Sequence, residues 1–404
     1  MGGPVSEGAW PQASSRKRGT GGPKAFFSSL GPAYRVRFLW LRNASYCCKI
    51  ADMKRVVTFG EIMLRLAPQD GTRLLQFPSL QATFGGAEAN VAVSLANFGM
   101  NAAFVSKVPD NPIGDAALSQ LKGFGVDTSY VLKGGERLGV YYLEKGAGPR
   151  PSLCVYDRKN SAIAESSPSD FDWNKILKGA DAFHFTGITP ALSKNCAALC
   201  LEAVKAAKKM GVLVCCDLNF RKKLWTKAQA KKAMTELCKH VDVLILNEED
   251  ASDVFGIKAP ASDIQGGKLS AEGYKKVAQE LFERFNLKAV AISQRESYSA
   301  SDNGWSGLYF ERGGNASQGK KAGEPKMFAS KKYDLRIVDR VGGGDAFAAG
   351  IIYGLLNKLG GQETVGFAAA AGALQQTIEG DFSRVSVEEV QRLAGGDSSG
   401  RVLR

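Results

Sequence analysis

The stretch DRVGGGDAFAAG, Asp339 to Gly350, places three glycines directly before an aspartate and then continues as an apolar run at helical spacing. The preceding DLRIVDRV has the pattern of an extended segment, so the glycines are predicted to lie at a turn between a strand and a helix. The unpaired N–H groups of a first helical turn, with the positive end of the helix dipole, favour an anion there. Side chains at 342–344 would keep that anion away, which explains the glycines.

The carboxylate of Asp345 in the same turn would normally repel a phosphate. Its presence makes chemical sense if Asp345 takes a proton from a hydroxyl that attacks the phosphate, while Mg²⁺ offsets the negative charge. The alternative from these residues alone is a structural turn in which Asp345 merely caps the helix.

Around this motif the chain alternates short apolar, β-branched runs with helical stretches of ten or more residues. This alternation predicts an α/β fold with a mostly parallel sheet and helices on both faces. In two segments, at about 61–81 and 130–161, the pattern changes to short strands separated by turn-rich stretches. These two segments are expected to form a small separate β-sheet. The clearest large-sheet runs are VVTF (56–59), VLVCCDLN (212–219), VDVLILN (241–247) and KAVAIS (288–293).

The net charge of +13 over 404 residues is unevenly distributed. Residues 1–52 carry eight Lys or Arg against two acidic residues, and a strand pattern begins right after Met53. We therefore expect a basic, disordered extension over 1–52 and one domain over 53–404. Alternatives for the extension are translation assigned from an upstream start, a transit peptide or a nucleic-acid-binding arm.

Several functional classes are disfavoured by composition. No apolar stretch is long enough to span a membrane, and the eight scattered cysteines suit a reducing compartment, so a cytoplasmic location is expected. The two histidines, His184 and His240, are too few and too far apart for a histidine-built zinc site and are interpreted as structural. The stretch GNASQGKK (314–321) nearly matches a Walker A loop, but it has lysine at the hydroxyl position and is interpreted as an exposed hairpin loop.

A second glycine cluster, FGGAEANVAVSLANFG (84–99), precedes another predicted helix. Gly85 and Gly86 would permit the close approach of a ligand, and the Asn90 amide can both donate to and accept from a polyol. Alone, this pattern is weak, since a glycine turn before a helix is usually only a turn.

Taken together and in this order, the two clusters resemble those of the ribokinase-like carbohydrate kinase family. The stretches PDNPIGDAALSQLKGFGVD (109–127) and NEED (247–250) match two further family motifs, so the resemblance covers almost all of 53–404. Within the family, GEIMLRL, VYDRKNSA, HFTGITPAL, DLNFRKKLW and GDF are most similar to the 2-keto-3-deoxygluconate kinase group. The resemblance implies an α/β/α sandwich around a mostly parallel sheet with a small β-sheet lid.

The resemblance also implies roles for individual residues. Asp345 would be the general base for the sugar's primary hydroxyl, and the amides of Gly342, Gly343 and Gly344 would form the anion hole for the transferred phosphoryl group. The implied sugar-binding residues are Gly86, Asn90, Tyr141, Tyr156, Arg158, Arg221 and Asp381. An acid sugar accounts for the arginines, because a carboxylate is best bound by a planar, permanently charged fork.

Nucleotide and metal contacts are implied less directly. The residues implied to bind ATP are Asn247, Asp250, Arg295, Gly342 and Gly344, with Asp250 acting on Mg²⁺, through water if not directly. The sequence departs from the family pattern at Arg340 and Gly343, which replace threonine and alanine, and at Asp250, which replaces glutamate.

The leading hypothesis is therefore ATP-dependent phosphorylation of 2-keto-3-deoxygluconate at its 6-hydroxyl. Fructokinase or another sugar kinase of the family is the nearest alternative. A non-catalytic sugar-sensing or nucleic-acid-associated protein is the alternative from another class. The expected partners are a small acid sugar and ATP, without nucleic acid or membrane, in a homo-oligomer formed through the lid.

Overall fold

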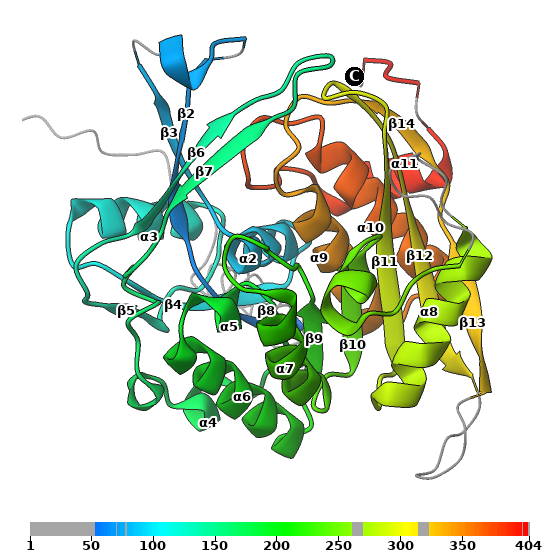
Figure 1. Ribbon diagram of the computed structural model, residues 1–404, viewed down its shortest axis with the longest axis horizontal. Coiled ribbons are helices and arrows are strands. Elements are labelled where there is room, and N and C mark those ends of the chain that lie inside the picture. Colours follow the sequence, from blue (N-terminus) through cyan, green and yellow to red (C-terminus); the bar gives the residue numbers. More distant parts are fainter. Residues whose placement is uncertain are drawn as a thin grey trace, which may run out of the picture. The chain divides into compact units, whose positions relative to one another are not determined.

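The computed structural model describes residues 53–69, 71–76, 79–260, 270–313, 323–397 and 399–402. The predictions for 1–52 and for the loop 314–321 lie outside these residues. In Figure 1 the described chain forms a large sheet with helices on both faces and a small sheet that stands at its upper edge. The predicted α/β class and the separate small sheet are both confirmed.

Within the described residues, the large sheet has ten strands in the order β13-β12-β11-β10-β9-β8-β1-β4-β5, with β14 paired to β12. The pairs from β11 through to β5 are parallel, whereas β12 pairs antiparallel with β11, β13 and β14. The strands are β1 (Arg55–Phe59), β4 (Asn101–Val108), β5 (Val131–Lys133), β8 (Ala182–Thr186), β9 (Leu213–Asp217), β10 (Val243–Asn247), β11 (Ala289–Ser297), β12 (Asp302–Gly313), β13 (Gly323–Ala329) and β14 (Tyr333–Arg336).

Helices cover both faces of this sheet, because the central strands are apolar on both sides. Val57 and Phe59 pack into one buried core, and Val56 packs into the other. The first core is closed by α4 (Trp173–Ile176), α6 (Lys194–Lys209), α7 (Lys227–Cys238) and α8 (Ala271–Arg284), together with α5 (Thr189–Leu192) and a π-helical turn (Ala251–Phe255). The second is closed by α2 (Ala87–Asn97), α3 (Pro112–Gly123), α9 (Gly343–Leu356), α10 (Gly361–Gln375) and α11 (Val387–Gly395).

The small sheet, here called the lid sheet, has the strand order β3-β2-β6-β7. The strands of the lid sheet are β2 (Met63–Ala67), β3 (Gln81–Gly85), β6 (Gly139–Glu144) and β7 (Leu153–Asp157). Of the two segments predicted to form this sheet, 61–81 contains β2 and ends where β3 begins. The segment 130–161 contains β6 and β7, and also β5, which belongs to the large sheet. One lid face is buried over Met63, Ala67, Tyr141 and Leu143. On β7, Leu153 and Val155 remain 46% and 44% exposed.

The close approach of α9 and α10 holds the glycine-rich turn in place. A Cβ at Gly350 of α9 would lie 2.5 Å from the Cα of Ala368 in α10, so only glycine allows this spacing. The helix α2 also packs against α9. The amino ends of α2 and α9 therefore come together near the lid sheet, as Figure 1 shows for the two helices.

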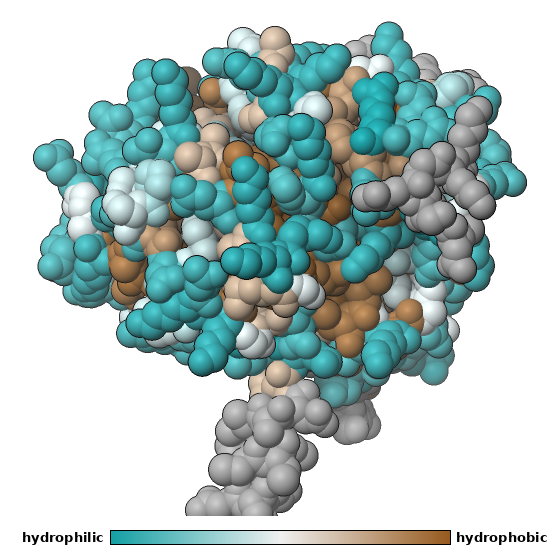
Figure 2. All heavy atoms as spheres, turned by 90° about the horizontal axis from the view of Figure 1, so that it is seen from below, coloured by the Kyte–Doolittle hydropathy of each residue, from teal (hydrophilic) through white to brown (hydrophobic). Residues whose placement is uncertain are grey.

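The face seen in Figure 2 is mainly hydrophilic, with apolar areas between the polar side chains. No helix among the described residues combines the length and the apolar character needed to cross a membrane.

Candidate active site

A cavity of about 660 Å³ is bounded by the lid sheet and by loops at the carboxyl ends of the large-sheet strands. Such positions are where ligands bind in parallel α/β sheets. Asp250 is the one sequence-predicted site residue that does not line this cavity. The cavity brings together the predicted residues Gly86, Asn90, Tyr141, Tyr156, Arg158, Arg221, Asn247, Arg295, Gly342, Gly343, Gly344, Asp345 and Asp381.

The glycine turn forms the amino end of α9. Gly342 is the N-cap with φ +83°, and a Cβ there would lie 2.5 Å from the backbone oxygen of Asp381, so the position requires glycine. A Cβ at Gly344 would meet nothing within 4 Å, so this position faces open space. Among the described residues, none accepts a hydrogen bond from the N–H groups of Gly343 or Gly344. The turn thus presents free donors to the cavity.

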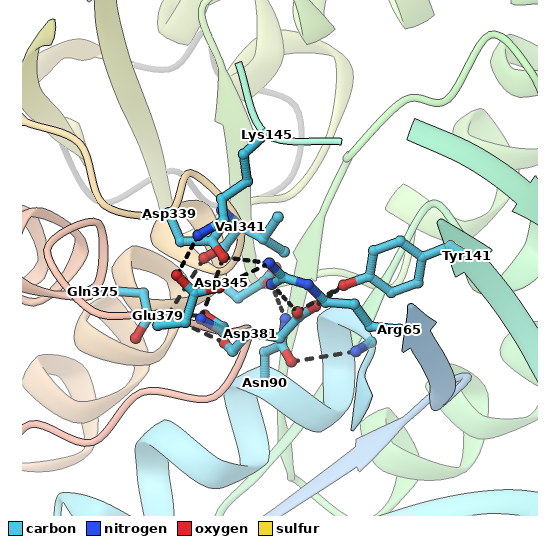
Figure 3. Close-up of polar contacts among 12 residues, drawn as sticks. Arg65, Asn90, Tyr141, Lys145, Asp339, Val341, Asp345, Gln375, Glu379 and Asp381 are labelled. Atoms are coloured by element: carbon cyan, nitrogen blue, oxygen red, sulfur yellow. Dashed lines mark hydrogen bonds and ion pairs between the residues drawn. The ribbon is translucent and has the colours of Figure 1, made fainter. Parts of the chain in front are cut away.

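Asp345 lies in the first turn of α9 and is 9% exposed. Its Oδ2 accepts a hydrogen bond of 2.6 Å from Nδ2 of Asn90, whose own Oδ1 accepts from the N–H of Gly86 (3.2 Å). Burial raises the pKa of Asp345 to about 7, although the Asn90 hydrogen bond and the charge of Arg221 lower it. A carboxylate with this pKa can accept a proton near neutral pH. Figure 3 shows Asn90 and Asp345 facing each other.

Arg158, predicted to bind the sugar carboxylate, is held by a buried acidic partner. Its Nε donates to Oε2 of Glu61 at 2.8 Å and its Nη2 donates to the same oxygen, while the Ser161 hydroxyl donates to Oε1 at 2.5 Å. The Tyr156 ring lies 5.4 Å from the guanidinium carbon of Arg158. Both charged groups line the cavity, so the fork is oriented before any ligand arrives.

Arg221 differs from Arg158 in having no ion pair with any described residue. Among the described residues, it donates one hydrogen bond, from Nη1 to the backbone oxygen of Phe220 at 3.4 Å. Arg221 is exposed and lines the cavity. Its positive charge therefore acts on the nearby carboxyl groups of Asp217, Asp250 and Asp345 without a direct ion pair to any of them.

Asp381 belongs to a buried network that joins the lid sheet to the loops beside the glycine turn (Figure 3). Arg65 on β2 donates to Asp381 at 2.8 Å and to Asp339 at 2.5 Å, and the Tyr141 hydroxyl donates to Asp381 at 2.6 Å. Arg65 and Tyr141 are direct cross-strand partners on β2 and β6. Burial alone would lower the pKa of Arg65, but the charges of Asp339 and Asp381 raise it. The network secures the lid sheet over the cavity.

Asp250, the predicted magnesium residue, is buried, and both its carboxylate oxygens accept backbone hydrogen bonds. The donors are the N–H groups of Phe220 and Asn247, each at 3.1 Å. Asp250 thus braces the two loops that carry Arg221 and Asn247. Its assignment to Mg²⁺ stays a prediction.

Several carboxyl groups on the cavity wall were not singled out from the sequence, among them Asp217 and Glu88. Burial, then the charges of Asp250 and Asp345, raise the pKa of Asp217. Glu88 accepts from the hydroxyls of Thr186 (2.7 Å) and Thr189 (2.6 Å), and burial raises its pKa despite these bonds. Glu88 could have been noticed from the sequence, because within GGAEAN it is a charged residue in the first turn of a helix that packs into the core.

Comparisons with known proteins extend over most of the chain. Residues 53–383 match the family model described as pfkB family carbohydrate kinase. The chain is 32% identical over 344 residues to a 2-dehydro-3-deoxygalactonokinase of Haloferax volcanii, covering 85% of this chain and 98% of the relative. It is 29% identical over 335 residues to a 2-dehydro-3-deoxygluconokinase of Bacillus subtilis, covering 82% and 93%.

Among solved structures, a 2-dehydro-3-deoxygluconokinase of Thermotoga maritima is 49% identical. It matches 85% of this chain and 100% of its own, with a TM-score of 0.78. The similarity therefore extends over the whole length of that protein.

Proposed function

Since this chain belongs to the pfkB family of carbohydrate kinases, we propose that it transfers the γ-phosphoryl group of ATP to the 6-hydroxyl of 2-keto-3-deoxygluconate, also named 2-dehydro-3-deoxygluconate. The observation that carries the proposal is the buried Asp345 carboxyl, with a pKa of about 7, in the same turn as the free N–H groups of Gly343 and Gly344.

In the proposed reaction Asp345 takes the proton of the 6-hydroxyl while that oxygen forms a bond to the γ-phosphorus. The bond from this phosphorus to the β,γ-bridging oxygen breaks, and ADP leaves. The N–H groups of Gly342, Gly343 and Gly344 would bind the oxygens of the transferred group, where negative charge develops. Asn90 keeps the Asp345 carboxylate aimed at the cavity through its 2.6 Å hydrogen bond.

The proposal of an acid sugar rests on Arg158 and Arg221. Glu61 neutralises and orients the first guanidinium, whereas the second has no ion pair among the described residues and so can offset the charge of a sugar carboxylate. Gly86, Tyr141, Tyr156 and Asp381 would complete the sugar site. Asp381 would act there through its bonds to Arg65 and Tyr141.

At the nucleotide end, the candidate residues are Asn247 and Arg295, with Gly342 and Gly344 toward the phosphates. Mg²⁺ would neutralise phosphate oxygens, and oxygen ligands suit it. Asp217 and Glu248 offer carboxylates on the cavity wall, although the described residues contain no cluster of three or more His, Cys, Asp or Glu arranged to hold a metal. The metal would therefore be held largely by phosphate and water.

A second candidate substrate is the galactonate epimer, favoured by the name of the Haloferax volcanii relative. The two sugars differ at one hydroxyl. Oligomerisation through the lid and a cytoplasmic location also remain proposals, the first supported by the exposed Leu153 and Val155 on β7.

The test is ATP turnover by the full chain with 2-keto-3-deoxygluconate, its galactonate epimer, fructose and ribose, side by side. We expect turnover with the acid sugars alone. Faster turnover with fructose or ribose than with the acid sugars would support a kinase activity but contradict the assignment of an acid sugar as substrate. No turnover with any of them by a folded protein would favour a sugar-binding role without catalysis.

The pH dependence of kcat/KM should show an acid limb near pH 7. A base must be unprotonated to accept a proton, and burial raises the pKa of Asp345 to about 7. Activity should therefore fall about tenfold for each pH unit below that value. A profile that stays flat down to pH 5 would show that another group accepts the proton.

Replacing Arg221 by Met should raise KM for 2-keto-3-deoxygluconate by about 10- to 100-fold, since a hydrogen bond between charged groups contributes about 1.5–3 kcal/mol. The neighbouring, exposed Lys222 provides the matched control, and Lys222→Met should leave KM within about twofold. Equal effects from the two variants would mean that general surface charge, and not a specific contact, attracts the sugar.

A further inference from the structure

Arg340 lies beside the glycine turn, at a position identified from the sequence only as a departure from the family pattern. Arg340 precedes Gly342 by two residues. Its Nη2 donates to the backbone oxygen of Ser299 (2.5 Å) and to Oδ1 of Asn303 (3.1 Å), and its Nε donates to the backbone oxygen of Ala300 (3.2 Å). Three neutral acceptors thus fix the guanidinium in one orientation.

The charge of Arg340 is not compensated by these contacts. No carboxylate of the described residues forms an ion pair with it, and its Nη1 donates to none of them. Arg340 is only half-buried and lines the cavity. Its positive charge and one free nitrogen are therefore available to a ligand.

Arg295 adds a second guanidinium to the same end of the cavity. Its one ion pair among the described residues is with Glu248, at 3.5 Å, and its side chain is 44% exposed. Burial lowers the pKa of Arg340, and the nearby charge of Arg295 lowers it further. Two like charges repel each other, so this arrangement is favourable when an anion lies between them.

We propose that Arg340 is a phosphate-binding residue that, together with Arg295, binds the phosphate chain of the nucleotide next to the glycine turn. The inference rests on the proposed kinase function and adds a residue to it. A polyphosphate fits this end of the cavity because it carries several negative charges, and the free Nη1 of Arg340 can donate charge-assisted hydrogen bonds to its oxygens. The free N–H groups of Gly343 and Gly344 would bind the same chain at its terminal phosphate.

The turn that orients Arg340 also receives the tip of the lid. The N–H of Ala300 donates to the backbone oxygen of Gly148 (2.8 Å), and the Ser301 hydroxyl accepts from the Gly148 N–H (3.0 Å). Gly148 lies between β6 and β7 of the lid sheet. Ala300, one of the three residues that position the guanidinium, is therefore also held by the docked lid.

Calorimetric titration of the full chain with ADP and with inorganic triphosphate, each with Mg²⁺ and without sugar, tests this proposal. For Arg340→Met we expect both dissociation constants to rise by about 10- to 100-fold, from the loss of one charged contact. Arg340→Lys keeps the charge but loses the three contacts that orient the guanidinium, so its loss of binding should be intermediate.

Arg336→Met is the matched control. Arg336 pairs with Asp302 in the same turn at 3.3 Å, but its side chain is 82% exposed and does not line the cavity. Its removal should change both dissociation constants by less than about twofold. Thermal unfolding of all variants separates lost binding from lost folding.

An Arg340→Met variant that melts like the wild type and binds both probes within twofold would overturn the proposal and leave Arg340 as a brace for the turn. If Arg340→Met does not fold, the Arg340→Lys variant is used in its place. Dissociation constants unchanged in Arg340→Lys would then overturn the proposal. Loss of binding in a protein that phosphorylates none of the sugars would refute the substrate assignment and support Arg340. Wild-type protein that binds neither probe would refute the phosphate site whatever the sugar.

Discussion

Replacing Asp345 by Asn is expected to lower kcat for 2-keto-3-deoxygluconate by about 10²- to 10⁴-fold, the usual contribution of a positioned general base. The amide has nearly the same shape as the carboxyl but cannot accept the proton of the 6-hydroxyl. The KM values for sugar and ATP should change much less, because the groups proposed to bind them stay in place. Steady-state kinetics with both substrates varied separates the two effects.

Asp334→Asn provides a control for the removal of one carboxylate, since the Asp334 side chain is 77% exposed. It should leave kcat unchanged. If Asp345→Asn kept more than a tenth of the wild-type kcat, the base would have to be another group on the wall. Glu88 and Asp217, whose pKa values are also raised by burial, would be the next to replace.

Replacing Arg65 by Met is expected to lower the free energy of unfolding by about 3–5 kcal/mol, the cost of removing one partner from a buried ion pair. Arg65 is 2% exposed, and its loss leaves Asp339 and Asp381, 1% and 4% exposed, without their cation. Urea unfolding of the full chain measures the effect. Sugar binding should weaken as well, because Arg65 joins β2 of the lid sheet to the loop that carries Asp381.

The matched control is Arg73→Met, which also removes an arginine close to the lid strands. Arg73 is 51% exposed and pairs with Glu144 at 3.1 Å, so its loss should cost less than about 1 kcal/mol. Equal costs for the two variants would show that the buried network adds no stability.

The loss in the free energy of unfolding caused by Arg65→Met should also depend on pH. Burial raises the pKa of Asp381 in the folded protein, and removing Arg65 takes away a charge that lowers it. A carboxyl with a raised folded-state pKa destabilises the fold above that pKa, and the penalty disappears as pH falls below its unfolded value of about 3.9. The difference between variant and wild type should therefore shrink from pH 7 toward pH 4.

Much of the architecture was readable from the sequence because it depends on local patterns. The runs around VVTF, VLVCCDLN, VDVLILN and KAVAIS coincide with β1, β9, β10 and β11, since strands buried on both faces must be apolar throughout. The glycine turn before Asp345 was equally visible, because a close approach to backbone N–H groups leaves few alternatives to glycine. The similarity to pfkB carbohydrate kinases confirms the family identified from four motifs.

The sequence could not show which charged groups pair with one another. Arg65 lies in MLRLA, an otherwise apolar strand, but no local pattern could reveal its partners Asp339 and Asp381, more than 270 positions away. Nor could the sequence show that Glu61 pairs with Arg158, or that the turn at 299–303 binds Arg340.

By itself, then, the sequence determined the α/β class, the two glycine turns and the carboxylate at the start of α9, because each follows from contacts between near neighbours in the chain. Only the tertiary structure decided that Glu61 neutralises Arg158, that Asp250 is bound by two backbone N–H groups, and that Arg221 and Arg340 form no ion pair with a described residue. The physical reason is that the availability of a charged group depends on its burial and on partners brought by distant segments, which no local pattern records.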